Sequence, residues 1–177
     1  MPGPSANLPA SERAANLLAA TAQLVTDAVA GELAGQLPHG ASAPAALVTI
    51  AHHPGLSIDR LSRPLGLTHS GTVRLIDRLE ADDLVAREKR GERAVRLHLT
   101  RRGRRAVERI EAARIVATTR LLSALSTQER RQLEAILSRL LAARTRDQED
   151  LRRICRLCSF DACEPEGRRC PVAAAAR

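Results

Sequence analysis

Four cysteines stand near the C-terminus, and the chain contains no others. They follow the spacing C-x2-C-x4-C-x6-C and are Cys155, Cys158, Cys163 and Cys170. Thiolates bind soft and borderline metals well, and two of them separated by two residues at a helix end can chelate one centre. The later pair would then complete a tetrahedral set. The pattern predicts a metal site, either zinc or an iron–sulfur cluster, and leaves thiol–disulfide sensing and inert cysteines as alternatives.

Other residues of the tail suit such a site. Apolar side chains that could cover the metal are Ile154, Leu157, Phe160 and Val172. Arginines that would offset the charge of four thiolates are Arg153, Arg156, Arg168 and Arg169. The sequence does not separate zinc from an iron–sulfur cluster, because cysteine serves both.

Arginine is the second residue type with evident chemistry. The formal net charge is +8, the pI is about 10.9 and Lys89 is the only lysine, so arginine carries nearly all of the positive charge. A guanidinium makes paired hydrogen bonds with phosphates and with guanine edges. The composition therefore indicates a nucleic-acid partner, with a solvated basic surface as the alternative.

Signatures of catalysis are not found in the sequence. There is no Gly-rich cofactor loop, no pair of catalytic carboxylates and no nucleophile triad, so we expect a protein that is not an enzyme. An electron-transfer protein built on the four cysteines remains the alternative. The histidines are scattered and are expected at surface or capping positions, although His52 and His53 could belong to an effector pocket.

The middle of the chain has the pattern of a helix-turn-helix. Ser57 to about Arg63 is predicted to be a short helix that Pro64 closes, and Gly66 permits a tight turn. Thr68 caps a longer helix that runs to about Asp83. Its predicted buried stripe is Val73, Ile76 and Leu79. A short helix, a glycine-containing turn and a longer helix are the order of a helix-turn-helix.

Two short strands are expected to follow. The first covers about 84–88, and the second, about 93–99, alternates apolar Val95, Leu97 and Leu99 with polar residues. A turn at Gly91 would join them into a hairpin with basic residues at its tip. Such a hairpin after a helix-turn-helix is a wing.

Longer helices are predicted on both sides of this unit. Ser11 is expected to cap a helix that ends near Pro38, and Ser126 with Glu129 forms a capping box for a helix that is expected to continue to about Ile154. With one aromatic residue in the chain, packed helices suit the composition better than a sheet sandwich. The fold class is mainly α with a small β-hairpin wing. The predicted segments are a disordered N-terminus over 1–10, a helix within 11–40, a winged helix-turn-helix over 41–100, helices over 101–154 and a Cys-rich tail over 155–177.

From Pro54 to Gly103 the sequence resembles the DNA-binding core of the MarR family. The most specific stretch is Leu67-Thr-His-Ser-Gly-Thr-Val-Arg-Leu-Ile-Asp-Arg-Leu-Glu80, followed by Leu84-Val85 and by Arg93-Ala-Val-Arg-Leu-His-Leu-Thr100. Gly91 stands where the family wing often carries an aspartate before its arginine. The resemblance implies a homodimeric transcriptional regulator of repressor type whose flanking helices, within 11–154, pair two subunits.

DNA contacts follow from this resemblance and from the residue types. Two recognition helices entering successive major grooves imply double-stranded DNA with a near-palindromic operator. The candidate contacts are Thr68, His69, Ser70, Thr72, Arg74 and Arg78 on the helix and Arg90 and Arg93 in the wing. Arg74 is the best candidate for a guanine edge. The arginines at 101–105 are expected either to clamp phosphates or to pair with Glu108.

The family often binds small phenolic or lipophilic effectors between its dimer helices and its winged domain, which implies a small aromatic effector as one signal. The Cys-rich tail is an alternative sensor. No apolar run approaches 18 residues and the first ten residues do not form a signal peptide, so no membrane contact and a cytoplasmic location are expected. A winged-helix interaction adaptor that does not bind DNA remains a competing function.

Overall fold

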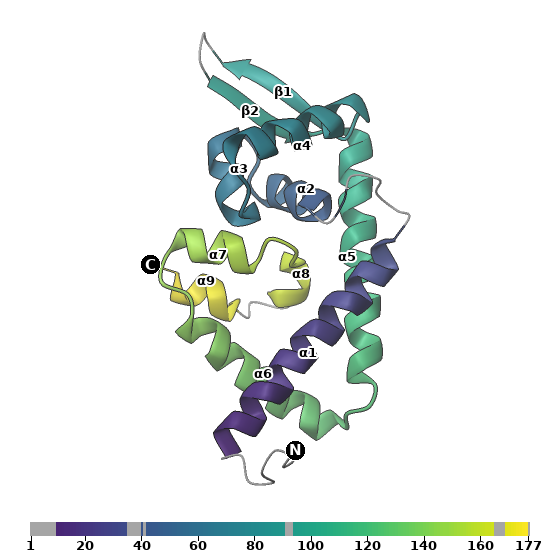
Figure 1. The fold of residues 1–177 in the computed structure, drawn as a ribbon, viewed down its shortest axis with the longest axis vertical. Coiled ribbons are helices and arrows are strands. Elements are labelled where there is room, and N and C mark those ends of the chain that lie inside the picture. Colours follow the sequence, from purple (N-terminus) through teal and green to yellow (C-terminus); the bar gives the residue numbers. More distant parts are fainter. Residues whose placement is uncertain (1–9, 35–39, 41, 91–93, 165–168, 177) are drawn as a thin grey trace, which may run out of the picture.

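A computed structural model describes residues 10–34, 40, 42–90, 94–164 and 169–176. The elements are α1 (Ala10–Leu33), α2 (Ser42–His52), α3 (Ile58–Leu65), α4 (His69–Ala81), β1 (Val85–Arg90), β2 (Ala94–Leu99), α5 (Arg101–Leu122), α6 (Thr127–Ala143), α7 (Gln148–Ile154), α8 (Phe160–Cys163) and α9 (Pro171–Ala175). The prediction of a mainly helical fold with one antiparallel hairpin is confirmed (Figure 1). The stretch 1–9, for which disorder was predicted, lies outside the described residues. None of the described helices is long and apolar enough to cross a membrane.

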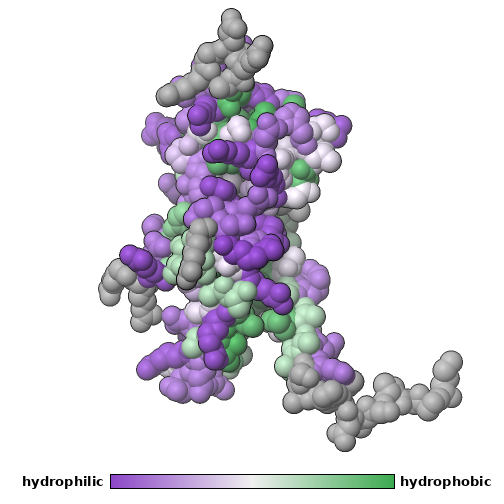
Figure 2. Space-filling view, turned by 90° about the vertical axis from the view of Figure 1, so that its left-hand side faces the viewer, coloured by the Kyte–Doolittle hydropathy of each residue, from purple (hydrophilic) through white to green (hydrophobic). Residues whose placement is uncertain are grey.

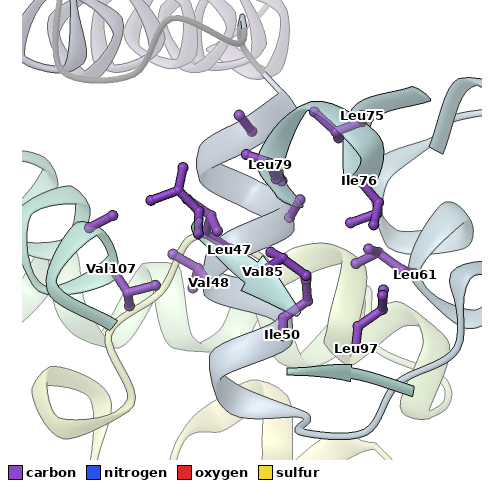
Figure 3. Packing of buried hydrophobic residues seen from close by; sticks show 14 of the residues in the cluster. Leu47, Val48, Ile50, Leu61, Leu75, Ile76, Leu79, Val85, Leu97 and Val107 are labelled. Atoms are coloured by element: carbon purple, nitrogen blue, oxygen red, sulfur yellow. The ribbon is translucent and has the colours of Figure 1, made fainter. Parts of the chain in front are cut away.

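Helix α2 lies at the centre of the main core. Its residues from Ala43 to Ile50 are all buried, and the alanines among them let neighbouring elements approach closely. Figure 3 shows side chains from α2, α3, α4, both strands and α5 converging around Leu47 and Ile50. The core is built from leucine, isoleucine, valine and alanine, as the composition requires.

The helix-turn-helix forms as predicted, with its caps in place. The Ser57 hydroxyl accepts from the amide of Arg60, and Gly66 ends α3 with a left-handed φ of 64°. Thr68 caps α4 by accepting from the amide of Gly71 at 3.1 Å. Pro64 lies inside the last turn of α3, one residue before its end, where the sequence pattern had placed the stop.

The buried stripe of α4 begins one residue earlier than predicted. It consists of Thr72, Leu75, Ile76 and Leu79, while Val73 is only partly buried. Thr72 is 0% exposed, and its hydroxyl donates to the carbonyl of Thr68 at 3.0 Å. The prediction that Thr72 is an exposed position for DNA contact is therefore wrong. A hydroxyl that bonds its own helix can be buried without loss of a hydrogen bond.

The wing is an antiparallel pair in which Val85 faces Leu99 and Arg90 faces Ala94. The predicted turn around Gly91 falls on residues 91–93, outside the described part. The chain before α3 adds an isolated bridge between Leu56 and Leu97. Gly55 permits this bridge with a φ of +80°, a conformation that favours glycine.

A close backbone contact joins the base of the wing to α5. Thr100 caps α5 by accepting from the amide of Gly103 at 3.0 Å, and its own hydroxyl donates to the carbonyl of Asp83 at 2.5 Å. A Cβ atom added at Gly103 would lie 2.0 Å from the carbonyl oxygen of Leu84. The contact between α5 and Leu84 therefore requires glycine at this position.

Helices α1, α5 and α6 form a long frame, in which α5 runs from the base of the wing to the far end of the molecule (Figure 1). Helix α1 starts at Ala10, so Ser11 lies inside it and not at its cap. The capping box of Ser126 and Glu129 is confirmed. Helix α6 ends at Ala143 and not near Ile154, because Asp147 caps a new helix, α7, by accepting two backbone amides.

Large apolar side chains on this frame are exposed. On α1 and α6 they are Leu17, Leu18, Leu24, Ile136, Leu137, Leu140 and Leu141, with exposures of 38–55%. None of the residues of α6 is buried, although its leucines and isoleucine repeat at helical spacing. Figure 2 shows hydrophobic side chains at the surface in the lower half of the molecule, as well as smaller areas near the wing. Such a face is typical of a helix that packs against a partner.

Candidate nucleic-acid interface and cysteine cluster

The N-terminal half of α4 presents polar side chains at the surface. Thr68, His69 and Ser70 are exposed, as predicted. The imidazole Nδ1 of His69 lies 2.6 Å from the carboxylate of Asp59 on α3, so this histidine has a partner within the chain. The hydroxyls of Thr68 and Ser70 lie 3.3 Å apart. These groups offer hydrogen bonds to a ligand at the start of the helix, but His69 and Thr68 also serve the fold.

Arg74 is exposed and makes no hydrogen bond or ion pair within the described part of the chain. Arg78, one turn later, is also exposed. Asp77 and Glu80 of the same helix bind Arg87. Arg74 is therefore a long cationic side chain on the face of α4 that is turned away from the core.

Arg87 joins α4 to the wing, a role that the sequence analysis missed. Its Nη2 donates to Asp77 at 2.6 Å and its Nη1 donates to Glu80. Burial opposes the charged form of Arg87, while the hydrogen bonds and charges of the two carboxylates raise its pKa above the ordinary value. Two carboxylates three residues apart on one helix, followed by an arginine in the next strand, are the signal that could have revealed this contact.

The predicted wing contacts are not placed. Arg93 lies outside the described residues, and the side chain of Arg90 is likewise not described, although its backbone belongs to β1. At the start of α5, Arg101, Arg102 and Arg105 are exposed. Arg104 donates to the carbonyl of Leu99 at 2.9 Å. The exposed arginines of α5 form a second basic surface next to the base of the wing.

The four cysteines come together in the C-terminal tail, and all are free thiols. Cys155 and Cys170 are 6% and 8% exposed and share an apolar cluster with Leu151 and Val172. Cys158 packs against that cluster, while Cys163 is exposed. Of the predicted covering residues, Ile154 and Phe160 also pack on the cluster, whereas Leu157 packs on the main core.

Cys158 is the centre of this thiol cluster. Hydrogen bonds from the thiols of Cys155 and Cys163 lower the pKa of Cys158, and the guanidinium of Arg114 on α5 acts in the same direction. The same contacts raise the pKa of Cys155 and of Cys163. Among the described residues, no group of three or more His, Cys, Asp or Glu side chains is placed so that it could hold a metal ion.

Arg114 was not predicted as a partner of the cysteines. The predicted tail arginines have other contacts: Arg153 donates to Asp150 at 3.2 Å, and Arg156 donates to the carbonyl of Arg153 at 2.5 Å. Arg169 is exposed and Arg168 lies outside the described residues. The guanidinium that acts on Cys158 therefore comes from α5, through a contact that no local pattern reveals.

The tail docks on the winged domain through His52. The imidazole Nε2 of His52 lies 3.0 Å from the carbonyl oxygen of Cys158, which only accepts, so Nε2 carries the proton. The same nitrogen is 3.4 Å from Glu111 on α5. The ring stacks on Phe160 with centroids 3.7 Å apart and an interplanar angle of 17°. His52 was expected at a surface or cap position or in an effector pocket, and it contacts the tail instead.

A second contact connects α7 to α3. Nη1 of Arg63 donates to Glu149 at 3.1 Å. Helices α7, α8 and α9 thus lie between the winged domain and α6, beside α5 (Figure 1). Because α7 packs on α3 and α9, the helices α7, α8 and α9 together are called the tail below.

A half-open cavity of about 460 Å³ lies between α1, α2, α5 and the tail. Its walls are mostly apolar, and include Val25, Val29, Leu33 and Leu157. Arg114 and Arg156 add positive charge to one side. The cavity has the size and lining of a site for a small apolar or anionic molecule.

Comparisons with known proteins agree with this architecture. Residues 41–94 match the model of the MarR family. A MarR family protein from Bacillus stearothermophilus has a similar structure, with 27% identity, a TM-score of 0.67, and coverage of 77% of this chain and 96% of that one. RV1404 from Mycobacterium tuberculosis has 23% identity, a TM-score of 0.67, and coverage of 77% and 96%.

A third similar structure is that of the Mycobacterium tuberculosis MarR family protein Rv2887 in complex with DNA. Its identity is 25%, its TM-score is 0.59, and 76% of this chain and 98% of that chain are covered. No curated protein matches the sequence. The winged helix-turn-helix and its helical frame are therefore a MarR-like fold.

Proposed function

We propose that the chain is a MarR-type transcriptional regulator, a repressor that binds duplex DNA through α4 and the wing. The observation that carries the proposal is Arg74, an exposed and uncommitted arginine on the second helix of a capped helix-turn-helix. A helix in this position enters a major groove, where a guanidinium can pair with a guanine edge. The basic surface of α5 would contact phosphates beside it. The similar fold of a MarR family protein in complex with DNA supports the same assignment.

A second copy of the chain is the partner that fits the exposed apolar face of the frame. Helices α1 and α6 together expose seven large apolar side chains at 38–55%. A helix with a leucine stripe and no buried residue is not stable by its own packing. A two-fold pair would bury these faces and present two α4 helices to successive grooves, and the operator would then be a near-palindrome. A monomer at working concentration in sedimentation would contradict this arrangement.

Replacement of Arg74 by alanine tests the function. An operator is first selected from a pool of random duplexes, and affinity for it and for random DNA is then measured at one fixed salt concentration. Loss of one bidentate guanine contact costs about 1–3 kcal/mol per half-site, so operator affinity should fall by about 5- to 150-fold per half-site. Binding to random DNA should fall much less.

Arg144→Ala is the matched control, because it removes the same charge from an exposed position at the end of α6, away from α4. It should leave operator affinity within about twofold of the wild type. An equal loss on operator and random DNA for Arg74→Ala would mean that Arg74 contacts only phosphates. Failure of the wild-type protein to enrich any duplex at low salt would refute the function itself.

Two features are suited to receive the signal to which such a regulator responds. One is the apolar cavity between α1, α2 and α5, which would hold a small aromatic effector. The other is the cysteine cluster, which would hold a metal or redox centre. Arg114 belongs to both.

A further inference from the structure

We propose that Cys155, Cys158, Cys163 and Cys170 hold one thiolate-ligated metal centre, and that this centre keeps the tail docked on the winged domain. The coupling part of this proposal rests on the function proposed above, while the metal part stands by itself. A zinc ion and an iron–sulfur cluster share the required chemistry, which is a cationic centre with four sulfur ligands.

The positions of the cysteines fit a single centre. Cys155 ends α7, Cys158 lies three residues later and donates its amide to the Cys155 carbonyl at 2.9 Å, and Cys170 immediately precedes α9. Cys155 and Cys170, far apart along the tail, meet in one buried cluster. Cys163 ends the short helix α8, and its thiol hydrogen-bonds with that of Cys158. Three short helices thus carry the four cysteines in one part of the tail, and binding of one metal would require their side chains to rearrange around it.

The helices and the apolar cluster of the tail are small. Helix α8 has four residues and α9 has five, far below the length at which a helix is stable in water. The apolar cluster of the tail has four buried members, and two of them are cysteines, the others being Leu151 and Val172. Segments of this size usually need a metal or disulfides in addition to an apolar core. A metal centre would supply that free energy.

Charge also favours a metal. Four thiolates on a divalent ion leave a net charge of −2, which the site must balance. Arg114 reaches the cluster from α5, and the carbonyl of Cys158 is bound by His52, so groups outside the tail fix the central ligand. Interactions of this kind around a metal site orient its ligands.

The same contacts connect the centre to the elements that carry α4. Phe160 lies between Cys158 and Cys163 in sequence and stacks on His52 of α2. Glu149 of α7 pairs with Arg63 of α3. With the metal removed, the tail would lose its fixed shape and these contacts with it. The winged domain would then be less firmly held to the frame. Part of the free energy of operator binding would be spent on ordering the winged domain, so the operator affinity would fall.

The metal part is tested on the full-length protein purified without oxygen, by elemental analysis and a visible spectrum. One zinc per protomer with no visible absorption, or iron with sulfide and a visible band, would each support the centre and identify it. Cys158→Ser should lose the metal. Ala162→Ser, which adds a hydroxyl at an exposed position of α8 without removing a thiol, should keep it. Substoichiometric metal in the wild type, or full metal in Cys158→Ser, would overturn the proposal.

The coupling part is tested by operator affinity before and after metal removal, with a chelator for zinc or controlled oxidation for a cluster and thiols then re-reduced. We expect a loss of at least about fivefold. His52→Gln should keep the metal but show a smaller difference between the two states. Equal or higher affinity without metal would refute the coupling. No operator binding in either state would refute the proposed function, while the metal analysis still decides the centre.

Discussion

Replacing Gly103 with alanine should destabilise the protein, although alanine is the better helix former. The new Cβ would lie 2.0 Å from the carbonyl oxygen of Leu84, 3.0 Å from its carbon and 3.3 Å from Cδ2 of Leu99. Real Cβ atoms do not come within 3.0 Å of such neighbours, so the Leu84 carbonyl and α5 must separate by about 1 Å. The obstacle is backbone, which cannot rotate away as a flexible side chain can.

The size of the effect follows from three contributions. Forcing an atom into a packed contact costs about 1–3 kcal/mol. The hydrogen bond from the amide of Thr100 to the Leu84 carbonyl, 3.2 Å long, would weaken, at about 0.5–1.5 kcal/mol if it is lost. Helix propensity returns up to about 1 kcal/mol. We expect the free energy of unfolding to fall by about 2 kcal/mol, which corresponds to a Tm lower by about 4–8 °C in a chain of this size.

Thermal unfolding followed by circular dichroism measures this shift, with all proteins at one protomer concentration because association would raise the Tm. Gly31→Ala is the matched control. Gly31 also lies inside a helix, but nothing stands within 4 Å of the added Cβ, so its Tm should stay the same or rise by a few degrees. A Tm for Gly103→Ala equal to or above that of the wild type would refute the steric reasoning.

Two further predictions concern ionic contacts. Arg87→Gln should lower the free energy of unfolding, measured by urea denaturation, by about 1–2 kcal/mol, because it removes the hydrogen bonds to Asp77 and Glu80. Arg87→Lys should retain only part of the stability that Arg87→Gln loses. A loss below about 0.3 kcal/mol for Arg87→Gln would contradict the role of Arg87. Hydrogen bonds from Arg146 lower the pKa of Asp150 to about 2, so ionised Asp150 stabilises the fold above its unfolded pKa of about 4, and this stabilisation is lost as pH falls through about 2. The Tm difference between the wild type and Asp150→Asn should therefore be largest above pH 4 and shrink toward pH 2, and a pH-independent difference would exclude this cause.

Elements with local start signals could be predicted from the sequence. Ser57, Thr68, Thr100 and Ser126 cap their helices because a side-chain oxygen reaches the amide three residues ahead, a contact encoded within one turn. Asp147 gave the same kind of signal, with two acidic residues in the first turn of α7. Apolar residues also follow Asp147, so the leucine stripe of α6 was extended past this residue. For that reason the end of α6 at Ala143 was not predicted.

Contacts between distant parts of the chain could not be predicted in this way. His52 and the carbonyl of Cys158 are 106 positions apart, and neither residue type indicates that the other is its partner. Nothing in the local sequence distinguishes Arg114 from the other arginines of α5, and its contact with Cys158 arises only from the packing of the tail. The cysteine spacing predicted that the four thiols belong together, but their position beside α2 and α5 depends on the packing of α7 on α3. Thr72 was misplaced because polarity was taken to mean exposure.

The bridge between Leu56 and Leu97 has a mechanical consequence. The amide of Gly55 donates to the Leu97 carbonyl at 3.0 Å, the amide of Leu97 donates to the Leu56 carbonyl at 3.0 Å, and Arg96 donates to the carbonyl of Gly55 at 2.9 Å. These bonds fasten the returning strand of the hairpin to the segment that leads into α3. We therefore expect a force on either strand to be transmitted to α3 and α4. The hairpin should move together with these two helices and not independently of them.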